Sequence, residues 1–567
     1  MLTRLRIRKL KAFPDADIEL GPVTVLCGPN NSGKTAALQA IALWRMGVAA
    51  WRMERGDGST ARKRSGVAIN RRDMVALPVP HTNLLWHGTR TRVAALRNGH
   101  TITQNLRIDI IANGIGSQGE WECGLEFDYS SSEVIHVRPL RFSDSSEPDR
   151  MSVPEAAFDV RVAFLPAMSG LAAVEPKWEP GRIEVLIGEG QTAQVLRNLC
   201  LRLHEQHRDR WDRLVDLMLK LFGVTIQPPA NVVARGEVTM EYSYNGVTLD
   251  LTSAGRGQQQ ILLLLAYVLA HPGSTLLLDE PDAHLEIVRQ RETYNLLSEL
   301  AQQNGSQIVA ASHSEVILEE AAGKDTLVAF VGKPHRMDGR GSQVKKWLAE
   351  YPIDHLYQAE LSGWVLYLEG STDLAILQAF AMKLNHPAGV ILERPFVVYV
   401  ANDPSKVQRH FYALREAMPD VTGIALFDRL DRLPREIGAE AMMWSKREIE
   451  NYLTKREVLE AWAQEDEGDD LFAQGRVAEM QTALEAIENA QLQLGRDIWS
   501  PDIKATDEVL DQIFRRYFQA TRQPLRFRKT DYHRMVRFIP REEIDPEVTE
   551  KLDRIAKAGQ RAQPRVS

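Results

Sequence analysis

One short loop near the N-terminus restricts the fold more than any other feature of this 567-residue chain. Residues 28–35 read GPNNSGKT and match the pattern G-x-x-x-x-G-K-[ST] at every fixed position. The loop follows an apolar run, residues 23–27, and precedes residues 36–46, which have a helical pattern. Backbone N–H groups of a loop between a buried strand and a helix cradle phosphates, so the sequence predicts a nucleoside triphosphate site.

Two side chains of this loop have separate predicted tasks. The Lys34 ammonium would reach the β- and γ-phosphate oxygens, and the Thr35 hydroxyl would bind Mg²⁺. The other positions would contribute backbone N–H groups. The loop residues that we assign to the nucleotide are Asn30, Asn31, Ser32, Gly33, Lys34 and Thr35.

A second stretch of the chain carries two more groups suited to phosphate chemistry. Residues 253–258 read SAGRGQ, a turn of small residues that leads directly into an apolar helical run. Unpaired N–H groups at such a helix start bind anions, and the small side chains allow close approach. An apolar strand, residues 274–278, then ends in Asp279 and Glu280. One carboxylate would hold a metal ion, and the other would activate water.

His313 is a further candidate for the same site. It follows an apolar strand, residues 306–311, which is predicted to come after the Asp279 strand and an intervening helix. Parallel strands joined in this way end at one edge of a sheet, where ligands bind. The His313 imidazole would therefore donate a hydrogen bond to the γ-phosphate.

Composition is that of an ordinary globular protein, with 44% hydrophobic and 26% charged residues. The net charge of −7 excludes a general basic field, so a nucleic-acid site must be a local patch. Three widely spaced cysteines (Cys27, Cys123 and Cys200) have no metal-ligand spacing and indicate a reducing compartment. The longest apolar run, residues 261–270, is too short to cross a bilayer, and the N-terminus does not resemble a signal peptide. We expect a cytoplasmic protein without a membrane partner.

The region between the loop and the second stretch has mixed patterns. Strands are predicted between residues 84 and 137, with a hairpin turn at Asn113-Gly114, and a second hairpin turn at Asn245-Gly246. Residues 191–222 have helical periodicity. The basic stretch of residues 51–73 is either a solvated loop or a contact with a DNA backbone.

Taken together, these motifs resemble those of ABC-type ATPases. Residues 28–35 are similar to their Walker A loop and residues 253–258 to their signature motif. Residues 275–280 resemble the Walker B strand with its catalytic glutamate, and His313 resembles the switch histidine. The resemblance covers residues 1–331. It implies ATP binding between two subunits.

That resemblance also assigns roles in a head-to-tail dimer. Ser253, Gly255 and Gln258 of one subunit would complete the nucleotide site of the other, and Glu280 would activate the attacking water. The sequence SAGRGQ replaces the transporter form LSGGQ, as in the soluble SMC-like and OLD branches. No SMC arm is present, since no long heptad array interrupts the module.

A second domain is predicted after residue 352. Residues 364–368, 395–401 and 423–427 read as strands with helices between them, which predicts a parallel sheet. Carboxylates that converge at the strand ends would hold Mg²⁺ and stabilise charge in phosphodiester cleavage, although single acids there are often ordinary loop residues. The acidic residues at these ends are Glu369, Asp373, Asp428 and Asp431.

This half resembles a TOPRIM domain, and its combination with the ATPase resembles the OLD family of ATP-dependent nucleases. Glu369 and Asp373 match the family's E-x-x-x-D. Asp428 matches the first acid of its D-x-D, but Leu430 occupies the second position and Asp431 follows one step on. The implied metal is Mg²⁺, with Mn²⁺ as an alternative.

Two further side chains would complete this site. Residues 443–453 are similar to the REIENYL stretch of such proteins, and on an extended strand Glu448 and Glu450 would share one face, so that Glu450 could add a metal ligand. Lys529 would neutralise the cleaved phosphate. Around it, residues 514–541 interleave aromatic residues with arginines, which suits either stacking on bases or an amphipathic region with solvated charges.

The predicted fold class is α/β. We expect an ABC- or OLD-type ATPase domain over residues 1–350 with β-rich and helical insertions at about 47–250, a smaller TOPRIM-like parallel domain over 360–545, and a tail over 546–567. The predicted function is an ATP-gated, Mg²⁺-dependent DNA endonuclease in bacterial anti-phage defence, a homodimer or larger with a possible companion defence protein. The alternative is an SMC-like DNA-sensing or clamp ATPase whose second domain is degenerate.

Overall fold

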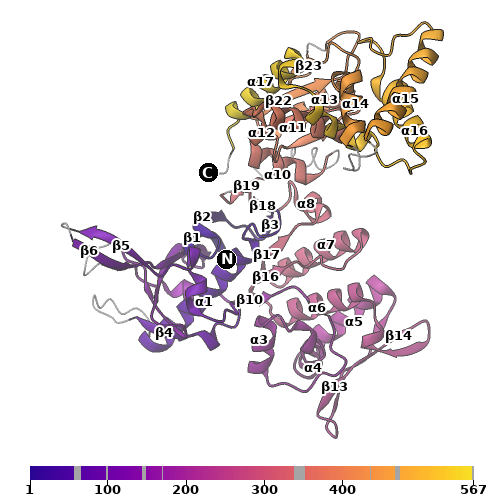
Figure 1. The fold of residues 1–567 in the computed structure, drawn as a ribbon. Helices are drawn as coiled ribbons and strands as arrows, with labels where there is room; N and C mark the ends of the chain where they lie inside the picture. The colour runs from indigo at the N-terminus through magenta and orange to yellow at the C-terminus, as the bar shows by residue number, and fades with distance from the viewer. Residues whose placement is uncertain are drawn as a thin grey trace. The chain divides into compact units, whose positions relative to one another are not determined.

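The computed structural model describes residues 1–56, 66–97, 100–143, 149–168, 170–331, 333–337, 351–433, 436–465 and 473–564. The chain divides into two compact units, Met1–Glu350 and Tyr351–Ser567 (Figure 1). Both units contain parallel strands that alternate with helices, which confirms the predicted α/β class. Residues 57–65 of the basic stretch, with Arg62, Lys63 and Arg64, lie outside the described residues.

An antiparallel sheet forms one layer of the first unit. The first two strands of the chain form a hairpin and pair antiparallel at Leu5↔Ile18. The strand order is β2 (Phe13–Glu19), β1 (Leu2–Leu10), β7 (Ile108–Gly116), β8 (Gly119–Tyr129), β9 (Val134–Pro139) and β4 (Val67–Asn70).

A second, mainly parallel sheet carries the candidate nucleotide residues. Its order is β10 (Val162–Leu165), β16 (Thr275–Asp279), β17 (Gln307–Ser312), β3 (Val23–Cys27), β18 (Thr326–Ala329) and β19 (His335–Arg336). Every residue of β3 and β17 is buried, as expected for strands covered on both faces. The register pairs Asp279 with Ala311 and Ser312 with Cys27, so three neighbouring strands end at one level.

Helix α1 (Lys34–Arg55) packs against both sheets and joins their cores. Its apolar side chains share one cluster with strands of the antiparallel sheet and with Leu277 and Val309 of the parallel sheet. The indole N–H of Trp44 donates to the Cys123 carbonyl at 3.0 Å. All three cysteines lie among the described residues, where they are buried and form no disulfide bond.

The helical part of the first unit leads to the signature segment. The predicted helical region contains α4 (Leu196–Gln206) and α5 (Arg208–Phe222), which pack on α6 (Arg256–Ala270). A hairpin of β14 (Glu241–Tyr244) and β15 (Val247–Asp250) precedes α6. Its turn at Asn245-Gly246 is confirmed, with φ of 50° and 78°, as a two-residue turn with left-handed backbone requires.

The predicted turn at Asn113-Gly114 is wrong. Strand β7 continues through both residues to Gly116, and the chain turns at residues 117–118. Gly114 lies opposite Trp121, and a Cβ on Gly114 would come within 2.3 Å of Trp121 Cζ2. The glycine is therefore required by packing against an indole ring rather than by a turn.

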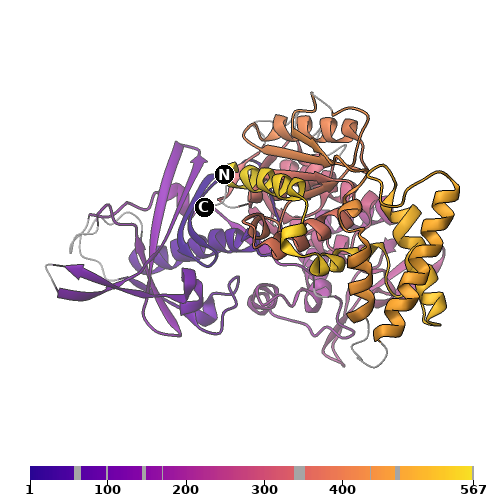
Figure 2. The same cartoon turned by 45° about the horizontal axis from the view of Figure 1, so that its top comes forward.

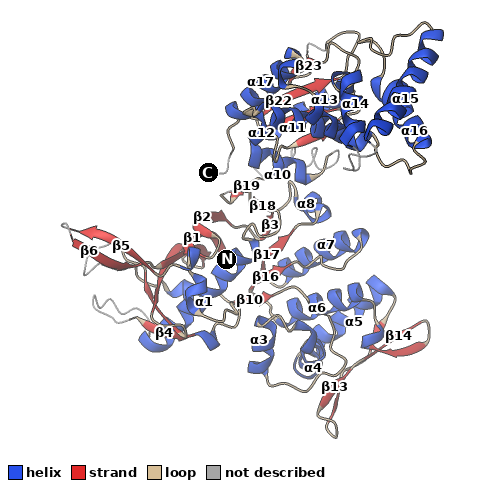
Figure 3. Ribbon diagram, viewed as in Figure 1, coloured by secondary structure: helices blue, strands red, loops and turns tan. Residues whose placement is uncertain are grey.

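The second unit has a four-stranded parallel sheet surrounded by helices (Figure 3). The strand order is β21 (Val397–Tyr399), β20 (Trp364–Leu368), β22 (Thr422–Phe427) and β23 (Glu440–Met443). Helices α10 (Ile353–Ser362), α11 (Ser371–Leu384) and α13 (Pro404–Ala417) belong to this part. Beyond it, α14 (Arg456–Glu465), α15 (Ala473–Gln493) and α16 (Asp511–Ala520) pack together, and Figure 2 shows α15 and α16 in orange and yellow at one end of the unit.

The expected tail over residues 546–567 is instead part of the second unit. Helix α17 (Pro546–Arg561) buries Val548, Leu552 and Ile555 in the same core cluster as the sheet. These residues recur at helical spacing, so the helix presents a continuous apolar face. In the described part of the chain, no helix combines the length and the apolar character that a membrane span needs.

Candidate functional site

The phosphate loop has the backbone that its glycines predict. Gly28 and Gly33 have φ of 152° and 103°, and an added Cβ would lie 2.8 Å from the Phe330 carbonyl oxygen or from the Phe13 ring. Neither position accepts a side chain. Helix α1 starts after this loop without a side-chain cap, which leaves its first N–H groups available to an anion.

Lys34 is held at the centre of the loop. Its Nζ donates to the carbonyls of Gly28 at 2.7 Å and Pro29 at 3.0 Å, and the residue is 6% exposed. Burial lowers the Lys34 pKa, while the nearby Glu280 and Asp279 carboxylates oppose that shift. A desolvated ammonium among carboxylates is suited to pairing with phosphate oxygens. Asn30, Asn31 and Ser32 lie on the same loop, and the buried Ser32 hydroxyl has no hydrogen-bond partner.

Thr35 and Asp279 come together as a candidate Mg²⁺ site. The Thr35 hydroxyl donates to Asp279, with 3.0 Å to each carboxylate oxygen. Burial raises the Asp279 pKa, against the effects of Thr35 and Lys34. A hydroxyl and a carboxylate are oxygen ligands of the kind Mg²⁺ prefers, so these residues fit that ion.

Glu280 and His313 form the second contact at this sheet edge. His313 Nδ1 lies 2.7 Å from Glu280 Oε2. Glu280 has a left-handed backbone, with φ of 51°, and its N–H donates to the Ala311 carbonyl at the end of β17. Burial raises the Glu280 pKa, His313 lowers it, and Asp282 raises it further. A carboxylate with a raised pKa accepts a proton from water more readily.

The signature residues lie at and just before the start of α6. Ser253 and Gly255 are exposed, and α6 begins at Arg256 without a side-chain cap. The Gln258 amide nitrogen is buried without a hydrogen-bond partner. Among the described residues, no hydrogen bond or ion pair joins these three to residues 28–35.

In the second unit, Glu369 and Asp428 face one another. Glu369 follows β20 and Asp428 follows β22, and these neighbouring strands run parallel. Burial raises the Asp428 pKa, and the hydrogen bond to Glu369 and the charges of Glu369, Asp373 and Glu450 raise it further. The neighbouring carboxylates add to the effect of burial because their negative charges disfavour ionisation of Asp428.

Asp373 supports Glu369 through the backbone. Asp373 Oδ2 accepts hydrogen bonds from the N–H groups of Glu369 at 3.0 Å and Gly370 at 3.3 Å. Burial raises the Asp373 pKa to about 6, the Gly370 N–H lowers it, and Glu369 raises it. Asp373 thus fixes the start of α11 and the position of Glu369.

Glu450 and Lys529 complete the acidic cluster. Lys529 Nζ lies 3.5 Å from Glu450 Oε1, and Glu450 is 2% exposed. Burial raises the Glu450 pKa to about 7, against the Lys529 charge. Burial would lower the Lys529 pKa, but Glu450, Glu448, Glu369 and Asp373 together raise it.

Two expectations for this cluster are corrected. Residues 449–452 form a short 3₁₀ helix, η7 (Ile449–Tyr452), so Glu448 and Glu450 do not share a strand face. Glu448 instead accepts from the Thr506 N–H. Asp431 is exposed on the loop after β22 and is not among the carboxylates that act most strongly on Asp428. The sequence spacing of acids could not show which loop residues turn inward.

The acidic cluster has the donor set for a divalent cation but not a finished coordination shell. Within the described ranges, no three His, Cys, Asp or Glu side chains converge closely enough to hold a metal ion. Glu450 Oε1, however, is buried without a hydrogen-bond partner, and all the donors are oxygens, as Mg²⁺ prefers.

Two AAA families match segments of the first unit. Residues 4–93 match the family described as "AAA domain", and residues 191–319 match the family described as "AAA domain, putative AbiEii toxin, Type IV TA system". These segments contain the phosphate loop, the signature turn, Asp279, Glu280 and His313. The first unit therefore contains an AAA-type ATPase domain.

A curated relative and several solved structures are also similar. The OLD nuclease of Thermus scotoductus (strain ATCC 700910 / SA-01) is 23% identical over 345 residues, or 56% of this chain and 60% of the relative. The chain thus spans about three fifths of that protein's length. The SMC head domain from Thermotoga maritima matches with 14% identity and a TM-score of 0.31, over 58% of this chain and 94% of that one. An Smc head from Pyrococcus furiosus with an extended coiled coil, bound to the C-terminal domain of ScpA, matches with 13% identity and a TM-score of 0.34, over 62% and 98%.

Proposed function

We propose that this chain, an ATPase related to the OLD nucleases, couples ATP binding in its first unit to Mg²⁺-dependent cleavage of DNA by the acidic cluster of its second unit. The supporting observation is the contact between Glu369 and Asp428 at the ends of two adjacent parallel strands, with Glu450 and Lys529 beside them. In this proposal the second unit is a TOPRIM-like domain.

The acidic cluster would act on a phosphodiester. Glu369, Asp428 and Glu450 would hold Mg²⁺ or Mn²⁺, which stabilises the charge that develops on the phosphate. Water would attack the phosphorus atom and lose a proton, the bond to one ester oxygen would break, and that oxygen would take up a proton and leave as a sugar hydroxyl. Lys529 would neutralise the phosphate, since its Nζ lies 3.5 Å from Glu450. Asp373 would hold Glu369 in place through its hydrogen bond to the Glu369 N–H.

The nucleotide site would control this chemistry. Lys34 would bind the β- and γ-phosphates, and Thr35 with Asp279 would hold Mg²⁺. Glu280 would take a proton from the attacking water, and His313 would contact the γ-phosphate. Ser253, Gly255 and Gln258 of a second copy would complete the site, because among the described residues no hydrogen bond or ion pair joins them to this chain's own loop. The proposed biological role is bacterial anti-phage defence, with a companion defence protein.

A plasmid-cleavage assay tests the proposal. The purified chain is incubated with supercoiled plasmid, ATP and Mg²⁺ or Mn²⁺, beside Glu369→Ala, Lys34→Ala and Asp431→Asn. We expect nicking by the wild type, its loss in Glu369→Ala with ATPase retained, and loss of ATPase in Lys34→Ala. Asp431→Asn is the matched control, because this exposed carboxylate follows the same strand as Asp428. It should cleave like the wild type.

One observation favours a second function. Leu430 occupies the place of the second acid in D-x-D, and the described side chains do not form a finished metal site. The chain would then be an SMC-like DNA-sensing or clamp ATPase whose second unit is structural. ATP hydrolysis without cleavage of any DNA in either metal would establish this alternative and overturn the nuclease proposal.

A further inference from the structure

A strongly basic segment adjoins the acidic cluster. Residues 514–541 contain nine Lys and Arg residues and one acid, Asp531, in a chain whose net charge is −7. Asp531 accepts from the Arg528 N–H at 3.1 Å, so its carboxylate caps a 3₁₀ helix, η9 (Lys529–Phe538). The exposed arginines of the segment are Arg515, Arg516, Arg522, Arg526, Arg528, Arg534, Arg537 and Arg541.

The aromatic residues of this segment are core residues, which rules out base stacking by most of them. Five are at most 4% exposed: Phe514, Tyr517, Phe518, Phe527 and Tyr532. The Trp462 ring lies 4.9 Å from the Phe514 ring and 4.7 Å from the Phe527 ring, measured between centroids. Phe538 is partly buried and lies under the Arg537 guanidinium at 4.5 Å.

The buried rings leave the arginines on the exposed side of the segment. On α16, Ile513, Phe514, Tyr517 and Phe518 face the core, so Arg515 and Arg516 project to solvent. The Arg526 guanidinium lies 5.6 Å from the Phe518 ring, and that of Arg534 lies 6.0 Å from the Phe527 ring. Among the described residues, no ion pair joins Arg515, Arg516 or Arg528 to an acidic side chain.

The same aromatic cluster connects these arginines to the acidic site. The Phe514 and Phe527 rings are 4.7 Å apart, which brings α16 against the residues just before Lys529. Lys529 in turn contacts Glu450. Arg528 directly precedes this lysine in the chain, so the basic segment adjoins the acidic cluster at Lys529.

We propose that the exposed arginines of residues 515–534 bind the phosphate backbone of duplex DNA and present a phosphodiester to the acidic cluster. The inference rests on the proposed nuclease function and adds the surface that positions its substrate. Guanidinium groups bind phosphates without reading sequence. Single strands are instead held by exposed aromatic rings, which this surface does not offer.

Binding of a fluorescein-labelled DNA duplex, followed by anisotropy, tests the surface. Measurements use full-length Glu369→Ala protein, which prevents cleavage, with and without Arg515→Ala/Arg516→Ala. We expect the added changes to weaken duplex binding about tenfold near 0.1 M salt and to lower the salt slope by about two, with ATPase unchanged. Arg394→Ala/Arg409→Ala is the control, because both arginines are exposed in the same unit outside the segment. It should bind like its parent.

The outcomes separate this inference from the proposed function. Unchanged duplex affinity in Arg515→Ala/Arg516→Ala, or an equal loss in the control, would refute the arginine surface even if plasmid cleavage is observed. Tighter binding of single-stranded DNA or of duplex RNA would refute the assignment to duplex DNA. If the wild type leaves plasmid intact but Arg515→Ala/Arg516→Ala loses duplex affinity, the nuclease function is refuted and the binding surface is supported.

Discussion

The Thr35 hydroxyl lies 3.0 Å from both carboxylate oxygens of Asp279, although 244 residues separate them in the chain. Asp279 ends β16, and Thr35 follows the loop after β3, with β17 between these two strands in the sheet. The strands end at a common level, which brings the two residues together. In P-loop NTPases generally, a Ser or Thr hydroxyl and an aspartate hold the Mg²⁺ that accompanies the triphosphate.

Removal of the Thr35 hydroxyl should weaken Mg²⁺ binding at the nucleotide site. Thr35→Val keeps the side-chain shape but leaves Asp279 without its donor, so we expect ATPase at limiting Mg²⁺ to fall by about tenfold or more. Thr35→Ser keeps the hydroxyl and is the matched control. ATP hydrolysis is measured against Mg²⁺ concentration. A Thr35→Val protein with wild-type Mg²⁺ dependence would contradict the assigned role.

Glu280→Gln should stop hydrolysis while ATP still binds. The amide keeps the size of the carboxylate but cannot take a proton from water, and loss of a general base costs about 10²- to 10⁴-fold in rate. ATP-bound dimers should then accumulate, seen by size-exclusion chromatography with light scattering. Glu299→Gln, an exposed carboxylate on α7 (Ile287–Gln303), is the control. Wild-type turnover in Glu280→Gln would mean that another group is the base.

The nucleotide residues were predictable because the motif of the loop and the apolar strands before Asp279 and His313 indicate the same sheet edge. The loop of residues 28–35 needs glycines for its backbone, and the structure shows no room for a side chain at Gly28 or Gly33. Asp279 and His313 follow runs of buried apolar residues, so the sheet edge was visible in the pattern. The roles of these residues stay predictions.

The acidic cluster was only partly predictable, because local spacing does not determine which way a loop turns. Glu369 and Asp428 follow buried strands and meet as expected. Glu450 reaches the cluster from a 3₁₀ helix, and neighbouring Glu448 turns to the Thr506 N–H. For the aromatic residues near Lys529 the sequence left base stacking and an amphipathic region open, because their burial depends on Trp462, which is distant in sequence.

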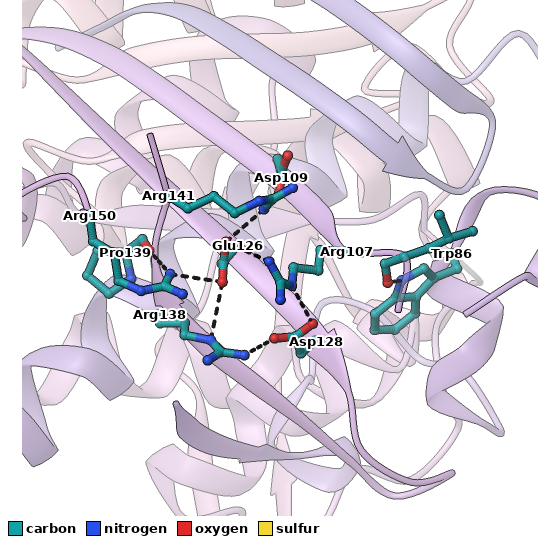
Figure 4. A network of polar contacts seen from close by, with 10 residues as sticks. Trp86, Arg107, Asp109, Glu126, Asp128, Arg138, Pro139, Arg141 and Arg150 are labelled. Atoms are coloured by element: carbon teal, nitrogen blue, oxygen red, sulfur yellow. Dashed lines mark hydrogen bonds and ion pairs between the residues drawn. The ribbon is translucent and has the colours of Figure 1, made fainter. Parts of the chain in front are cut away.

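Glu126 should stabilise the antiparallel sheet of the first unit. It is 0% exposed on β8, and four arginine side chains surround its carboxylate, with Arg141 at 2.7 Å and Arg150 at 2.8 Å (Figure 4). Glu126→Gln leaves these cations beside one another without the central charge. Because the arginines are partly exposed and can relax, we expect a loss of about 2 kcal/mol in the free energy of unfolding.

Urea unfolding measures this loss as a lower transition midpoint. Glu122→Gln is the matched control on the same strand, since Glu122 is 40% exposed where it pairs with Arg6. Its effect should stay within about 0.5 kcal/mol. Equal midpoints for Glu126→Gln and the wild type would show that the network contributes nothing to stability.

His410 should make the second unit less stable in mild acid. It is 2% exposed, its Nε2 lies 3.0 Å from His355 Nδ1, and its Nδ1 lies 2.8 Å from the Tyr367 hydroxyl. Burial, with a smaller effect of His355, lowers the His410 pKa to about 3, from 6.5 in the unfolded chain. Below pH 6.5 the His410 imidazole is therefore protonated in the unfolded chain but stays neutral in the folded chain. The contribution of neutral His410 to the free energy of unfolding is fully present above pH 6.5. As the pH is lowered from 7 to 5, we expect the free energy of unfolding to fall by about 2 kcal/mol.

Urea unfolding of the full chain at pH 7 and pH 5 checks this sign. His410→Gln should lower stability at pH 7 but remove about 2 kcal/mol of the difference between the two pH values, because glutamine does not titrate. His533→Gln, which changes a partly exposed histidine in the same unit, should keep the wild-type difference. If His410→Gln keeps that difference too, the acid sensitivity comes from other groups, and the buried imidazole is not its cause.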